Sequence, residues 1–553
     1  MLSRVARKSS RAAGAIPIAV NDPILPYAPG SAERKALREA LTKVESTCKD
    51  IPIIVGGEEI RNDNVKYQVS PYNHSQKIAK YYWADKDLLT KAADAAVAAQ
   101  HEWEHRPLRD RVQIFLKAAE MIKGPKRADI CATTMAGQAK NVIQAEIDAA
   151  CELIDFFTFN AQSALELETS QPLSPDVGIT NRIFYRGREG FVAAISPFNF
   201  TAIGGNLAGT PAMMGNPTLW KPSDTAILSN YLVYEILREC GLPDNIIQFV
   251  PADGPVFGEA ICEHPYLSMV NFTGSVKTFQ HLNMEVSKNL PLFKTFPAMI
   301  GECGGKNYHF VHNSADVRHV AVGTIRSAFE YSGQKCSACS RAYFPASRWA
   351  EIRENLLSIH SQLKMGTVDD FSIFMSAVID EASFNRVSGY IDAAKADPNC
   401  EIIAGGGYDK SKGFFVEPTI ILTNDPKCLT MQEEIFGPVL TVYVYEDDKM
   451  DETIEIMKDT SIYALTGAIY CEKESLVQEL TMKLRQTAGN FYINDKSTGS
   501  VVGQQWFGGA AKSGTNDKAG GPLYTSRFVS PQAIKRTHFH IKDWAYPSMS
   551  QEE

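Results

Sequence analysis

The amino-acid sequence predicts an α/β fold built on two doubly wound, largely parallel sheets. Short β-rich segments alternate with longer helical segments from about residue 50, and a second alternating series runs from about 300 to 495. Such alternation is typical of parallel sheets whose strands are joined by helices. The chain has 553 residues, 44% of them hydrophobic, so it is long enough to bury the cores of several domains.

The elements of the first series follow from their residue types. Apolar segments that end at turn residues predict strands at 51–55, 191–196, 216–222 and 246–251. Ala-rich or periodically apolar stretches predict helices at 87–103, 145–165 and 224–240. The last stretch, 496–553, is rich first in Gly, Ser and Thr and then in aromatic residues. This order favours a functional loop followed by a docking tail.

Charge and hydropathy exclude two classes of function. The chain carries 56 Lys and Arg against 64 Asp and Glu, which gives a net charge of −8. That balance argues against broad nucleic-acid binding through phosphate neutralisation. No uninterrupted apolar segment approaches the roughly 18 residues of a membrane span, so we expect no membrane span.

The first 21 residues are basic, with Arg4, Arg7, Lys8 and Arg11, and contain no acid before Asp22. An Arg-rich, Ser-bearing, acid-free leader is typical of a mitochondrial transit peptide. We therefore predict a transit peptide over 1–21. The alternative is a basic tail without a targeting role.

Eleven cysteines are scattered through the chain at irregular spacing. An odd number in a large chain argues against a disulfide framework and for reduced thiols. Cys336 and Cys339 form the one close pair, which resembles half of a zinc or redox site. No second pair or His cluster stands at ligand spacing, so no metal site is predicted.

Three residues are candidates for catalysis. Cys336 follows a Gly-Gln-Lys turn in which Lys335 adds a positive charge, and positive surroundings favour the nucleophilic thiolate. Glu302 stands among glycines in ECGGK, where a partly buried carboxyl could serve as a general base. Asn199 closes a strand in SPFNF, at an edge where its amide could meet an oxyanion. The alternatives are a buried thiol, a surface turn and a turn-forming Asn.

Three further motifs could bind a ligand. Lys221 ends a strand in KPSD, where it could hydrogen-bond a ribose or phosphate, although Ser223 and Asp224 are also common helix caps. The loop 271–275, NFTGS, leads into a helix, and a helix N-terminus binds anions. The segment 433–439, EEIFGPV, precedes a strand. The usual GxGxxG dinucleotide fingerprint is absent.

Taken together and in order, SPFNF, KPSD, FTGS, ECGGK, GQKCSACSR and EEIFGPVL resemble the NAD(P)-dependent aldehyde dehydrogenase superfamily. The resemblance runs from about residue 50 to 535. Within the superfamily it is strongest to the branch that acts on glutamate γ-semialdehyde. The segments that carry this similarity are QVSPYNH at 68–74, QAEIDAACELIDFF at 144–157, GQKCSACSR, and the long INDKSTGSVVGQQWFGGAAKSGTNDKAGG at 493–521.

The resemblance implies a role for each matching residue. Cys336 would be the nucleophile, Glu302 the general base and Asn199 the oxyanion donor. The residues implied to bind the cofactor NAD are Lys221, Ser223, Gly274, Ser275, Val276, Lys277, Thr278, Glu434 and Phe436. The residues implied to bind the substrate are Gly499, Ser500, Phe200, Phe507 and Glu152.

The resemblance also implies an activity and an architecture. The activity is NAD-dependent oxidation of L-glutamate γ-semialdehyde, in equilibrium with pyrroline-5-carboxylate, to L-glutamate, the second oxidation of proline breakdown. The architecture is two Rossmann-like domains plus a small oligomerisation element. Residues 22–300 would form mainly the NAD-binding domain, with part of the oligomerisation element near 175–195. Residues 301–500 would form the catalytic domain, and 501–553 the rest of the substrate loop and an oligomerisation tail. A homodimer in the mitochondrial matrix is expected.

Two departures and two alternatives accompany the resemblance. Phe279 stands where the cofactor loop often has a second Gly, and Asp224 where many members have Glu. NAD is favoured over NADP because an acid near Lys221 would repel a 2′-phosphate. The alternatives are another semialdehyde dehydrogenase of the superfamily and a homologue that has kept the fold but lost the chemistry.

Overall fold

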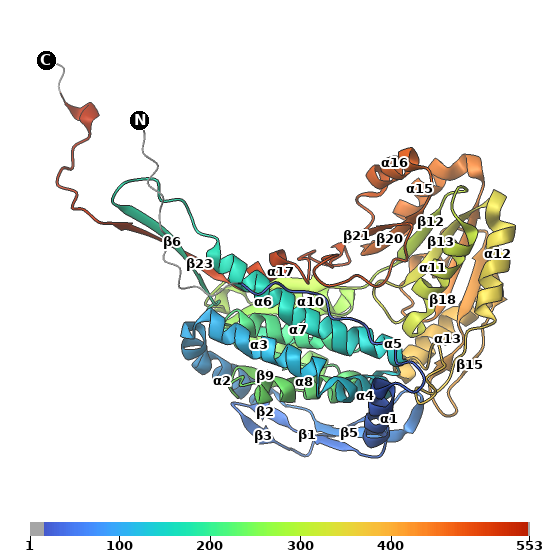
Figure 1. Ribbon diagram of the computed structural model, residues 1–553, viewed down its shortest axis with the longest axis horizontal. Coiled ribbons are helices and arrows are strands. Elements are labelled where there is room, and N and C mark those ends of the chain that lie inside the picture. The colour runs from blue at the N-terminus through green and yellow to red at the C-terminus, as the bar shows by residue number, and fades with distance from the viewer. Residues whose placement is uncertain (1–15, 551–553) are drawn as a thin grey trace.

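Two parallel sheets form the centre of the protein, whose computed structural model describes residues 16–550 (Figure 1). The first has five parallel strands in the order β11-β10-β7-β8-β9. The second has seven strands in the order β14-β17-β18-β13-β12-β20-β21, all parallel except for the pair β14–β17. The predicted α/β class with largely parallel sheets is confirmed.

The strands of the first sheet are β7 (Phe191–Ile195), β8 (Thr218–Lys221), β9 (Ile247–Phe249), β10 (Leu267–Thr273) and β11 (Ala298–Glu302). Those of the second are β12 (Asn307–Val311), β13 (Cys339–Pro345), β14 (Cys400–Ala404), β17 (Thr419–Thr423), β18 (Val439–Tyr445), β20 (Thr466–Tyr470) and β21 (Asn490–Ile493). The predicted strands at 191–196, 216–222 and 246–251 correspond to β7, β8 and β9.

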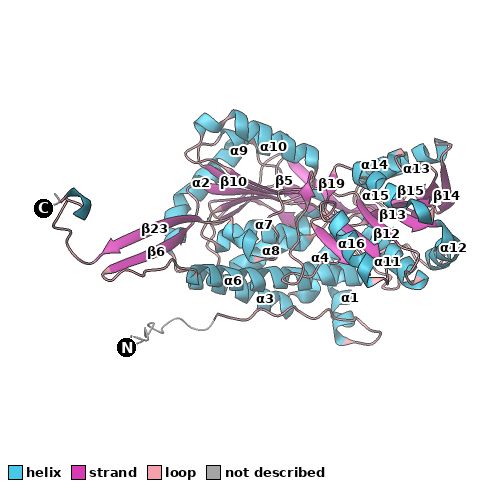
Figure 2. Cartoon of the chain, turned by 90° about the horizontal axis from the view of Figure 1, so that it is seen from above, coloured by secondary structure: helices cyan, strands magenta, loops and turns pink. Residues whose placement is uncertain are grey.

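Two layers of helices cover the first sheet, one on each face, as Figure 2 shows from above. In β7, Val192 and Ala194 share one core with α7 (Thr201–Met213) and α8 (Ile227–Glu239). Phe191 and Ala193 face the opposite core, with α2 (Lys86–His105), α9 (Gly254–Glu263) and α10 (Val276–Lys288). Because successive residues of a strand point to opposite faces, a fully apolar strand is buried on both sides.

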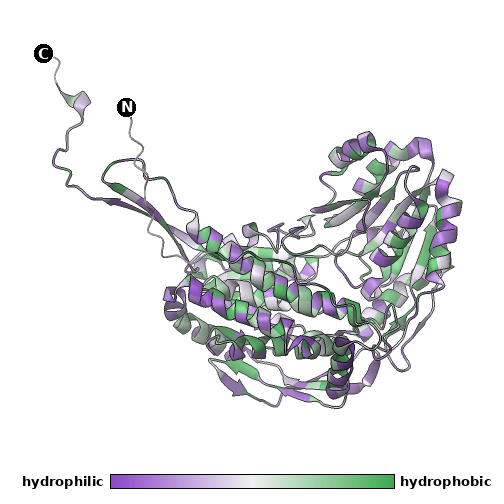
Figure 3. Ribbon diagram, viewed as in Figure 1, coloured by the Kyte–Doolittle hydropathy of each residue, from purple (hydrophilic) through white to green (hydrophobic). Residues whose placement is uncertain are grey.

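The second sheet is covered in the same way. Ala342 and Phe344 of β13 pack with α11 (Val317–Phe329) and α12 (Ala346–His360). Tyr343 lies in the other core, with α15 (Met450–Asp459) and α16 (Glu474–Leu484). Figure 3 shows the apolar residues gathered on the strands and on the inward sides of these helices.

A long helical segment runs beside α7, between the first sheet and solvent. It consists of α5 (Val142–Ala145), a π-helix η1 (Glu146–Glu152) and α6 (Leu153–Thr169), and it packs on α3 (Leu108–Lys123) and α4 (Arg127–Gln138). The prediction of one regular helix over 145–165 missed the π-helical turn. Such turns are rare and often occur at functional sites.

The predicted strand at 51–55 is in fact two strands in different sheets. β1 (Lys49–Ile51) pairs with β5 (Asn73–Tyr82), which also pairs with β4 (Val65–Ser70). β2 (Ile53–Val55) pairs instead with β3 (Glu58–Ile60). Pro52 separates the two strands, as expected for a residue that has no backbone N–H to donate.

A two-stranded arm projects from the body (Figure 1). It pairs β6 (Ile179–Arg186) with β23 (Ser530–Thr537) in antiparallel register along all eight residues of each strand. The remaining helices and strands are α1 (Ala32–Glu45), α13 (Glu381–Ala396), α14 (Leu429–Gln432), α17 (Pro522–Ser526), β15 (Tyr408–Asp409), β16 (Phe415–Val416), β19 (Tyr463–Ala464) and β22 (Ala510–Ala511), with the 3₁₀ turns η2 (Asp224–Ala226), η3 (Leu290–Leu292), η4 (Glu330–Gly333), η5 (Asp447–Lys449) and η6 (Pro547–Met549).

Most of the predicted leader, residues 1–15, lies outside the described residues. Its last residues lie on the body: the Asn21 amide donates to Asp155 Oδ2 and to the Val502 carbonyl, at 2.8 Å each. Within residues 16–550, no helix is both long and apolar enough to cross a membrane.

The strand order of the first sheet predicts where a ligand would bind. In the first sheet β7 lies next to β10, and the chain extends from β7 towards β9 on one side and from β10 to β11 on the other. Ligands of doubly wound sheets bind beyond the carboxyl ends of the strands at such a reversal. Asn199 follows β7 and Gly274 follows β10, so both lie at this edge.

Candidate active site

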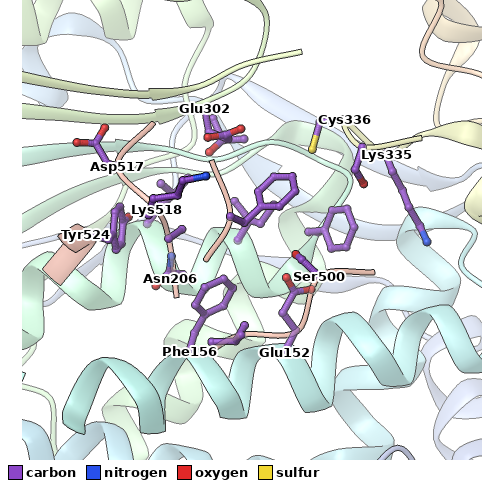
Figure 4. A pocket seen from close by; sticks show the side chains of 18 of the residues that line it. Glu152, Phe156, Asn206, Glu302, Lys335, Cys336, Ser500, Asp517, Lys518 and Tyr524 are labelled. Carbon is purple, nitrogen blue, oxygen red and sulfur yellow. The ribbon is translucent and has the colours of Figure 1, made fainter. Parts of the chain in front are cut away.

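A cavity lies where the two sheets meet, and it is lined by segments that are far apart in the sequence (Figure 4). Its walls come from η1 and α6, the start of α7, the ends of β10 and β11, the loop before β13 and the loops after β21. The residues predicted from the sequence that line it are Glu152, Phe200, Glu302, Lys335, Cys336, Gly499, Ser500 and Phe507.

Cys336 lies between η4, which is strained, and β13. Tyr331 and Ser332 both have φ of +53°, a left-handed conformation that costs roughly 1–3 kcal/mol for each non-glycine residue. The Ser332 hydroxyl donates to the Ser376 carbonyl at 2.6 Å and so helps to hold the turn. The Cys336 carbonyl accepts from the Asn307 amide at 2.7 Å.

The electrostatic surroundings of Cys336 differ from those expected. Its pKa is raised by burial and by the carboxylates of Glu302 and Glu434. The Lys335 ammonium pairs with Glu330 Oε2 at 3.0 Å, and its side chain points away from the sulfur in Figure 4. The expectation that Lys335 favours the thiolate was therefore wrong, because a buried carboxylate has already neutralised this cation. A base beside the thiol would favour its ionisation.

Glu302 is a carboxyl group suited to that task. It is the last residue of β11. Its Oε2 accepts from the Gly509 N–H at 3.4 Å, whereas its buried Oε1 has no partner among the described residues. Burial raises the pKa of Glu302 to about 8, although the Gly509 N–H and Lys518 oppose the shift. A base whose pKa lies near the working pH transfers protons efficiently in both directions.

Asn199 reaches the same loop from the other sheet. It is buried, and its Nδ2 donates to the carbonyl of Gln334, two residues before Cys336, at 3.1 Å. Asn199 itself is not among the residues that line the cavity, although the next residue, Phe200, is. A carboxamide has two N–H donors, so one N–H of Asn199 is left beyond its bond to Gln334.

The loop predicted to bind the substrate is tied to the loop of the nucleophile. The Ser497 N–H donates to His309 Nε2 at 3.3 Å, and its hydroxyl donates to the Ser337 carbonyl at 3.3 Å. Gly499 has φ of +85°, and a Cβ there would overlap the Lys496 ammonium. These constraints bring Gly499 and Ser500 into the cavity that contains Cys336.

Glu152 stands at the end of the π-helix η1 and lines the cavity opposite Cys336 (Figure 4). Burial and the nearby carboxylate of Asp148 raise its pKa, while Lys140 and Lys335 oppose the shift. Phe156, one helical turn further along α6, lines the same wall. Because residues four apart lie on the same face of a helix, the choice of Glu152 would also have pointed to Phe156.

The residues predicted to hold the adenosine end of NAD lie at the carboxyl edge of the first sheet. Lys221 ends β8, and its ammonium has one long contact, 3.5 Å to the Pro222 carbonyl. Burial lowers the pKa of Lys221, against the attraction of Asp224 and Asp253. Ser223 precedes η2 without capping it; its hydroxyl lies 3.3 Å from that of Thr225. A buried ammonium with so little compensation fits a ribose hydroxyl.

The predicted pyrophosphate region lies at the N-terminus of α10. The Ser275 hydroxyl accepts from the Thr278 N–H at 3.2 Å and caps the helix, whose first turn contains Val276, Lys277 and Thr278. The unpaired N–H groups of a first turn suit a phosphate. A Cβ on Gly274 would lie 2.6 Å from the Phe272 ring, so this approach requires glycine.

Phe279 stands where the cofactor loop often has a second Gly, and its packing accounts for the difference. Its ring stacks on Phe272 with centroids 5.5 Å apart, and a Cβ on Gly301 would overlap it. The aromatic pair thus fills the space that Gly301 leaves open. The wall below the pyrophosphate region is therefore apolar and close packed.

Glu434 and Phe436 lie close to the catalytic residues. Glu434 Oε1 accepts from the Gly305 N–H at 2.8 Å, and a Cβ on Gly304 would overlap its carboxylate. Burial raises the pKa of Glu434 to about 7. Phe436, with φ of +54°, packs edge-on against Phe198 at 5.8 Å. These positions fit a nicotinamide ribose beside Glu434.

Several residues that line the cavity were not singled out from the sequence, although four of them lie in the segments 144–157 and 493–521 that carry the resemblance. They are Gln144, Asn206, Gln505, Asp517, Lys518 and Tyr524. Lys518 has φ of +61°, and its ammonium donates to the carbonyls of Gly489 and Gly508 at 2.7 and 3.1 Å. It braces two loops that are separated by more than ten residues, which only the tertiary structure reveals.

Cys339 has a structural environment. It begins β13 and packs in the core beside α11, and its thiol lies 3.4 Å from the Arg341 carbonyl. All eleven cysteines are free thiols. The described residues contain no cluster of three His, Cys, Asp or Glu side chains that could hold a metal ion.

Comparison with known proteins identifies the family. The family model described as "Aldehyde dehydrogenase family" matches residues 61–534. The chain therefore belongs to the aldehyde dehydrogenase family, and the resemblance inferred from its motifs is confirmed.

Particular relatives are more informative than the family. The chain is 59% identical over 531 residues to the mitochondrial delta-1-pyrroline-5-carboxylate dehydrogenase of Danio rerio, covering 96% of this chain and 95% of that protein. It is also 59% identical over 530 residues to the protein of that name from Homo sapiens, covering 96% and 94%. The NAD-bound structure of delta-pyrroline-5-carboxylate dehydrogenase from Mycobacterium tuberculosis superposes with a TM-score of 0.94 at 41% identity, covering 98% and 100% of the two chains.

The raised pKa of Cys336 predicts how its reactivity depends on pH. A thiol with a raised pKa keeps its proton at neutral pH, so the thiolate fraction grows with pH across the whole accessible range. In the ligand-free protein, the alkylation of Cys336 by iodoacetamide should accelerate continuously from pH 6 to 9, as measured by peptide mass spectrometry. Cys339 is the internal control and should stay unmodified. A plateau below pH 8 would show that the thiol is already ionised there.

Proposed function

We propose that the chain oxidises L-glutamate γ-semialdehyde, which is in equilibrium with pyrroline-5-carboxylate, to L-glutamate with NAD. The observation that carries the proposal is a single cavity that contains Cys336, Glu302, the Gly499–Ser500 loop and Glu152. The 59% identity to mitochondrial delta-1-pyrroline-5-carboxylate dehydrogenases over nearly the whole chain supports this substrate.

The first step is addition of the Cys336 sulfur to the aldehyde carbon. Glu302 takes the thiol proton, and the new C–S bond converts the carbonyl oxygen into an oxyanion. The free N–H of the Asn199 amide donates to that oxyanion. A donor of this kind is typically worth about 3–4 kcal/mol in the transition state.

The adduct then loses hydride and becomes a thioester on Cys336. When bound, NAD supplies the hydride acceptor. On this proposal it is held by Lys221 and Ser223 at the adenosine ribose, by the segment from Gly274 to Thr278 at the pyrophosphate, and by Glu434 and Phe436 at the nicotinamide end. The buried position of Glu302 and Cys336 keeps the adduct away from bulk water.

Hydrolysis of the thioester completes the reaction. Glu302 first releases to solvent the proton that it took from the thiol. It then removes a proton from a water molecule, the resulting hydroxide attacks the acyl carbon, and the C–S bond breaks to release the product acid, which ionises, and the Cys336 thiolate, which takes its proton back from Glu302. The same carboxyl group thus acts as base twice, which its raised pKa allows.

The other end of the cavity suits a zwitterionic amino acid. The Ser500 hydroxyl and the backbone N–H groups around Gly499 can bind a carboxylate without a cationic side chain. Glu152 faces the substrate ammonium, and that positive charge would lower the raised pKa of Glu152 and favour its ionised form. Phe200 and Phe507 flank the aliphatic carbons between these ends.

The assignment of the nucleophile predicts a sharp difference between neighbouring cysteines. With pyrroline-5-carboxylate and NAD, Cys336→Ala should lose at least about 10³-fold in kcat because no covalent adduct can form. Cys339→Ala is the matched control, since it removes another buried thiol three residues away and should keep kcat within about twofold of the wild type. NADH absorbance measures both. Robust turnover by Cys336→Ala, or none by the wild type, would refute the proposal.

We also propose that the protein acts in the mitochondrial matrix and that residues 1–21 direct it there. The curated relatives from Danio rerio and Homo sapiens are named as mitochondrial, and the acid-free basic leader supports import.

A homodimer is the third part of the proposal. The arm formed by β6 and β23 carries exposed apolar side chains, among them Phe184, and the tail beyond it exposes Ile541, Trp544 and Tyr546. An extended apolar surface of this kind marks an association site. A second copy of the chain, packed against the arm and the tail, would bury it.

The homodimer is tested by charged substitutions on that surface. Phe184→Glu combined with Trp544→Glu should convert a species of twice 61.0 kDa into one of 61.0 kDa in sedimentation velocity, because two carboxylates would be buried without partners. Met482→Glu on α16 is the control, since Met482 is also exposed but lies away from the arm. A wild-type monomer, or a dimer that survives the double substitution, would contradict the proposal.

A further inference from the structure

A fully buried ion pair lies directly behind the cavity. Lys140 follows α4, and its ammonium donates to Asp148 Oδ2 on the π-helix η1 at 2.7 Å; neither side chain is exposed to solvent. Lys140 is carried into this position by Ala139, which ends α4 in a left-handed conformation with φ of +56°. Burial lowers the pKa of Lys140, and the carboxylate of Asp148 opposes that shift.

Asp148 connects this pair to the start of α7. Its two carboxylate oxygens accept from the N–H groups of Thr201 and Ala202, each at 2.9 Å. Phe200 occupies the N-cap position of α7 and provides no side-chain cap of its own. An acid from another helix therefore caps α7, and it fixes the backbone immediately after Asn199 and Phe200.

The ammonium of Lys140 also contacts two aromatic rings. It lies 4.0 Å from the centroid of Phe200 and 4.6 Å from that of Tyr331. Phe200 belongs to the wall of the cavity, and Tyr331 belongs to the strained turn before Cys336. Attraction between a cation and a ring is strengthened when both are removed from water. The charge of Lys140 thus contacts both the Asn199–Phe200 segment and the turn before Cys336.

Stability alone is a poor explanation of this arrangement. Removing two charges from water costs about as much as their attraction returns, and apolar replacements of buried pairs are often neutral or stabilising. Lys140 and Asp148 instead lie between the segment that follows β7 and the turn that precedes Cys336, and the relative position of these two parts must be kept. Their geometry specifies the position of catalytic groups.

We propose that Lys140, held by Asp148, is a positioning residue of the reaction: it fixes the Asn199–Phe200 segment relative to the turn that carries Cys336. The inference rests on the proposed function only for the identity of the substrate, because the two segments would have to be aligned for any aldehyde. A misplacement of about 1 Å at a reacting centre can cost about 10²-fold in rate.

The test removes the charges without leaving one of them unpaired. In Lys140→Met combined with Asp148→Asn, the amide oxygen introduced by the second substitution can still accept from α7, but no ammonium contacts Phe200 or Tyr331. We expect kcat per active site to fall by about 10–100-fold, while NAD binding measured by fluorescence quenching stays unchanged. Active sites are counted by the stoichiometry of NAD binding in the same titration, so misfolded protein does not enter the rate.

Arg111→Met provides a matched control at the opposite end of α7. Arg111 is also a buried cation, and it donates to the Met213 carbonyl at the last turn of that helix, at 3.1 Å. Arg111→Met should lower the melting temperature but leave kcat per active site within about twofold, since Arg111 does not reach the cavity. Lys140→Arg keeps the charge, so its kcat per active site should lie between those of the wild type and the double variant. If the double variant does not fold, Lys140→Gln takes its place in this comparison.

Two results would overturn the inference: a double variant whose kcat per active site stays within about twofold of the wild type, or an equal loss in Arg111→Met. The rates are measured with both pyrroline-5-carboxylate and propanal. A wild type that oxidises propanal alone would refute the proposed substrate, whereas the effect of Lys140 would still be read from the propanal rates.

Discussion

The short connection between the two sheets is the constraint on which the active site depends. Only residues 303–306 separate the end of β11 in the first sheet from the start of β12 in the second, so Glu302 is fixed within a few residues of both. Two glycines make the close approaches: a Cβ on Gly305 would lie 2.5 Å from the Cys336 carbonyl oxygen, and one on Gly304 would overlap the Glu434 carboxylate. Glu302, Cys336 and Glu434 are therefore brought together by close approaches that larger residues at positions 304 and 305 would prevent.

Burial sets the chemistry of the cavity once these groups are in place. It raises the pKa values of Cys336, Glu302 and Glu434, and the carboxylates near Cys336 reinforce the effect on the thiol. Lys335 and Lys140 do not offset the effect on the thiol, because Lys335 is paired with Glu330 and Lys140 with Asp148. In the ligand-free protein, burial thus favours the neutral form of both the Cys336 thiol and the Glu302 carboxyl group. On the proposed mechanism, nucleophilic attack depends on proton transfer to Glu302, which links the reactivity of Cys336 to the ionisation of its neighbour.

Much of the fold and part of the site could be predicted from the sequence. Strands such as β7 and β8 are continuous apolar segments, and the motifs around Cys336 and Glu302 have local signatures. Other features depend on tertiary contacts that no local pattern reports. The π-helical turn at Glu146–Glu152 shares its composition with a regular helix, and the neutralisation of Lys335 requires the fold to bring Glu330 beside it. Asp148 caps a helix that begins more than fifty residues later, and Pro52 divides a segment that reads as one strand.

The central claim is that Cys336 carries the acyl group and Glu302 releases it. The most direct measurement is peptide mass spectrometry of Glu302→Gln after it is mixed with NAD and pyrroline-5-carboxylate. The mixture is held at pH 9, where solvent can take the proton of the Cys336 thiol in place of Glu302, whereas Gln cannot deprotonate the attacking water. The account then predicts a slowly formed acyl adduct on the Cys336 peptide, none on the Cys339 thiol, and about one NADH formed per active site before turnover stops. NADH formation without an adduct, or an adduct on another residue, would contradict it.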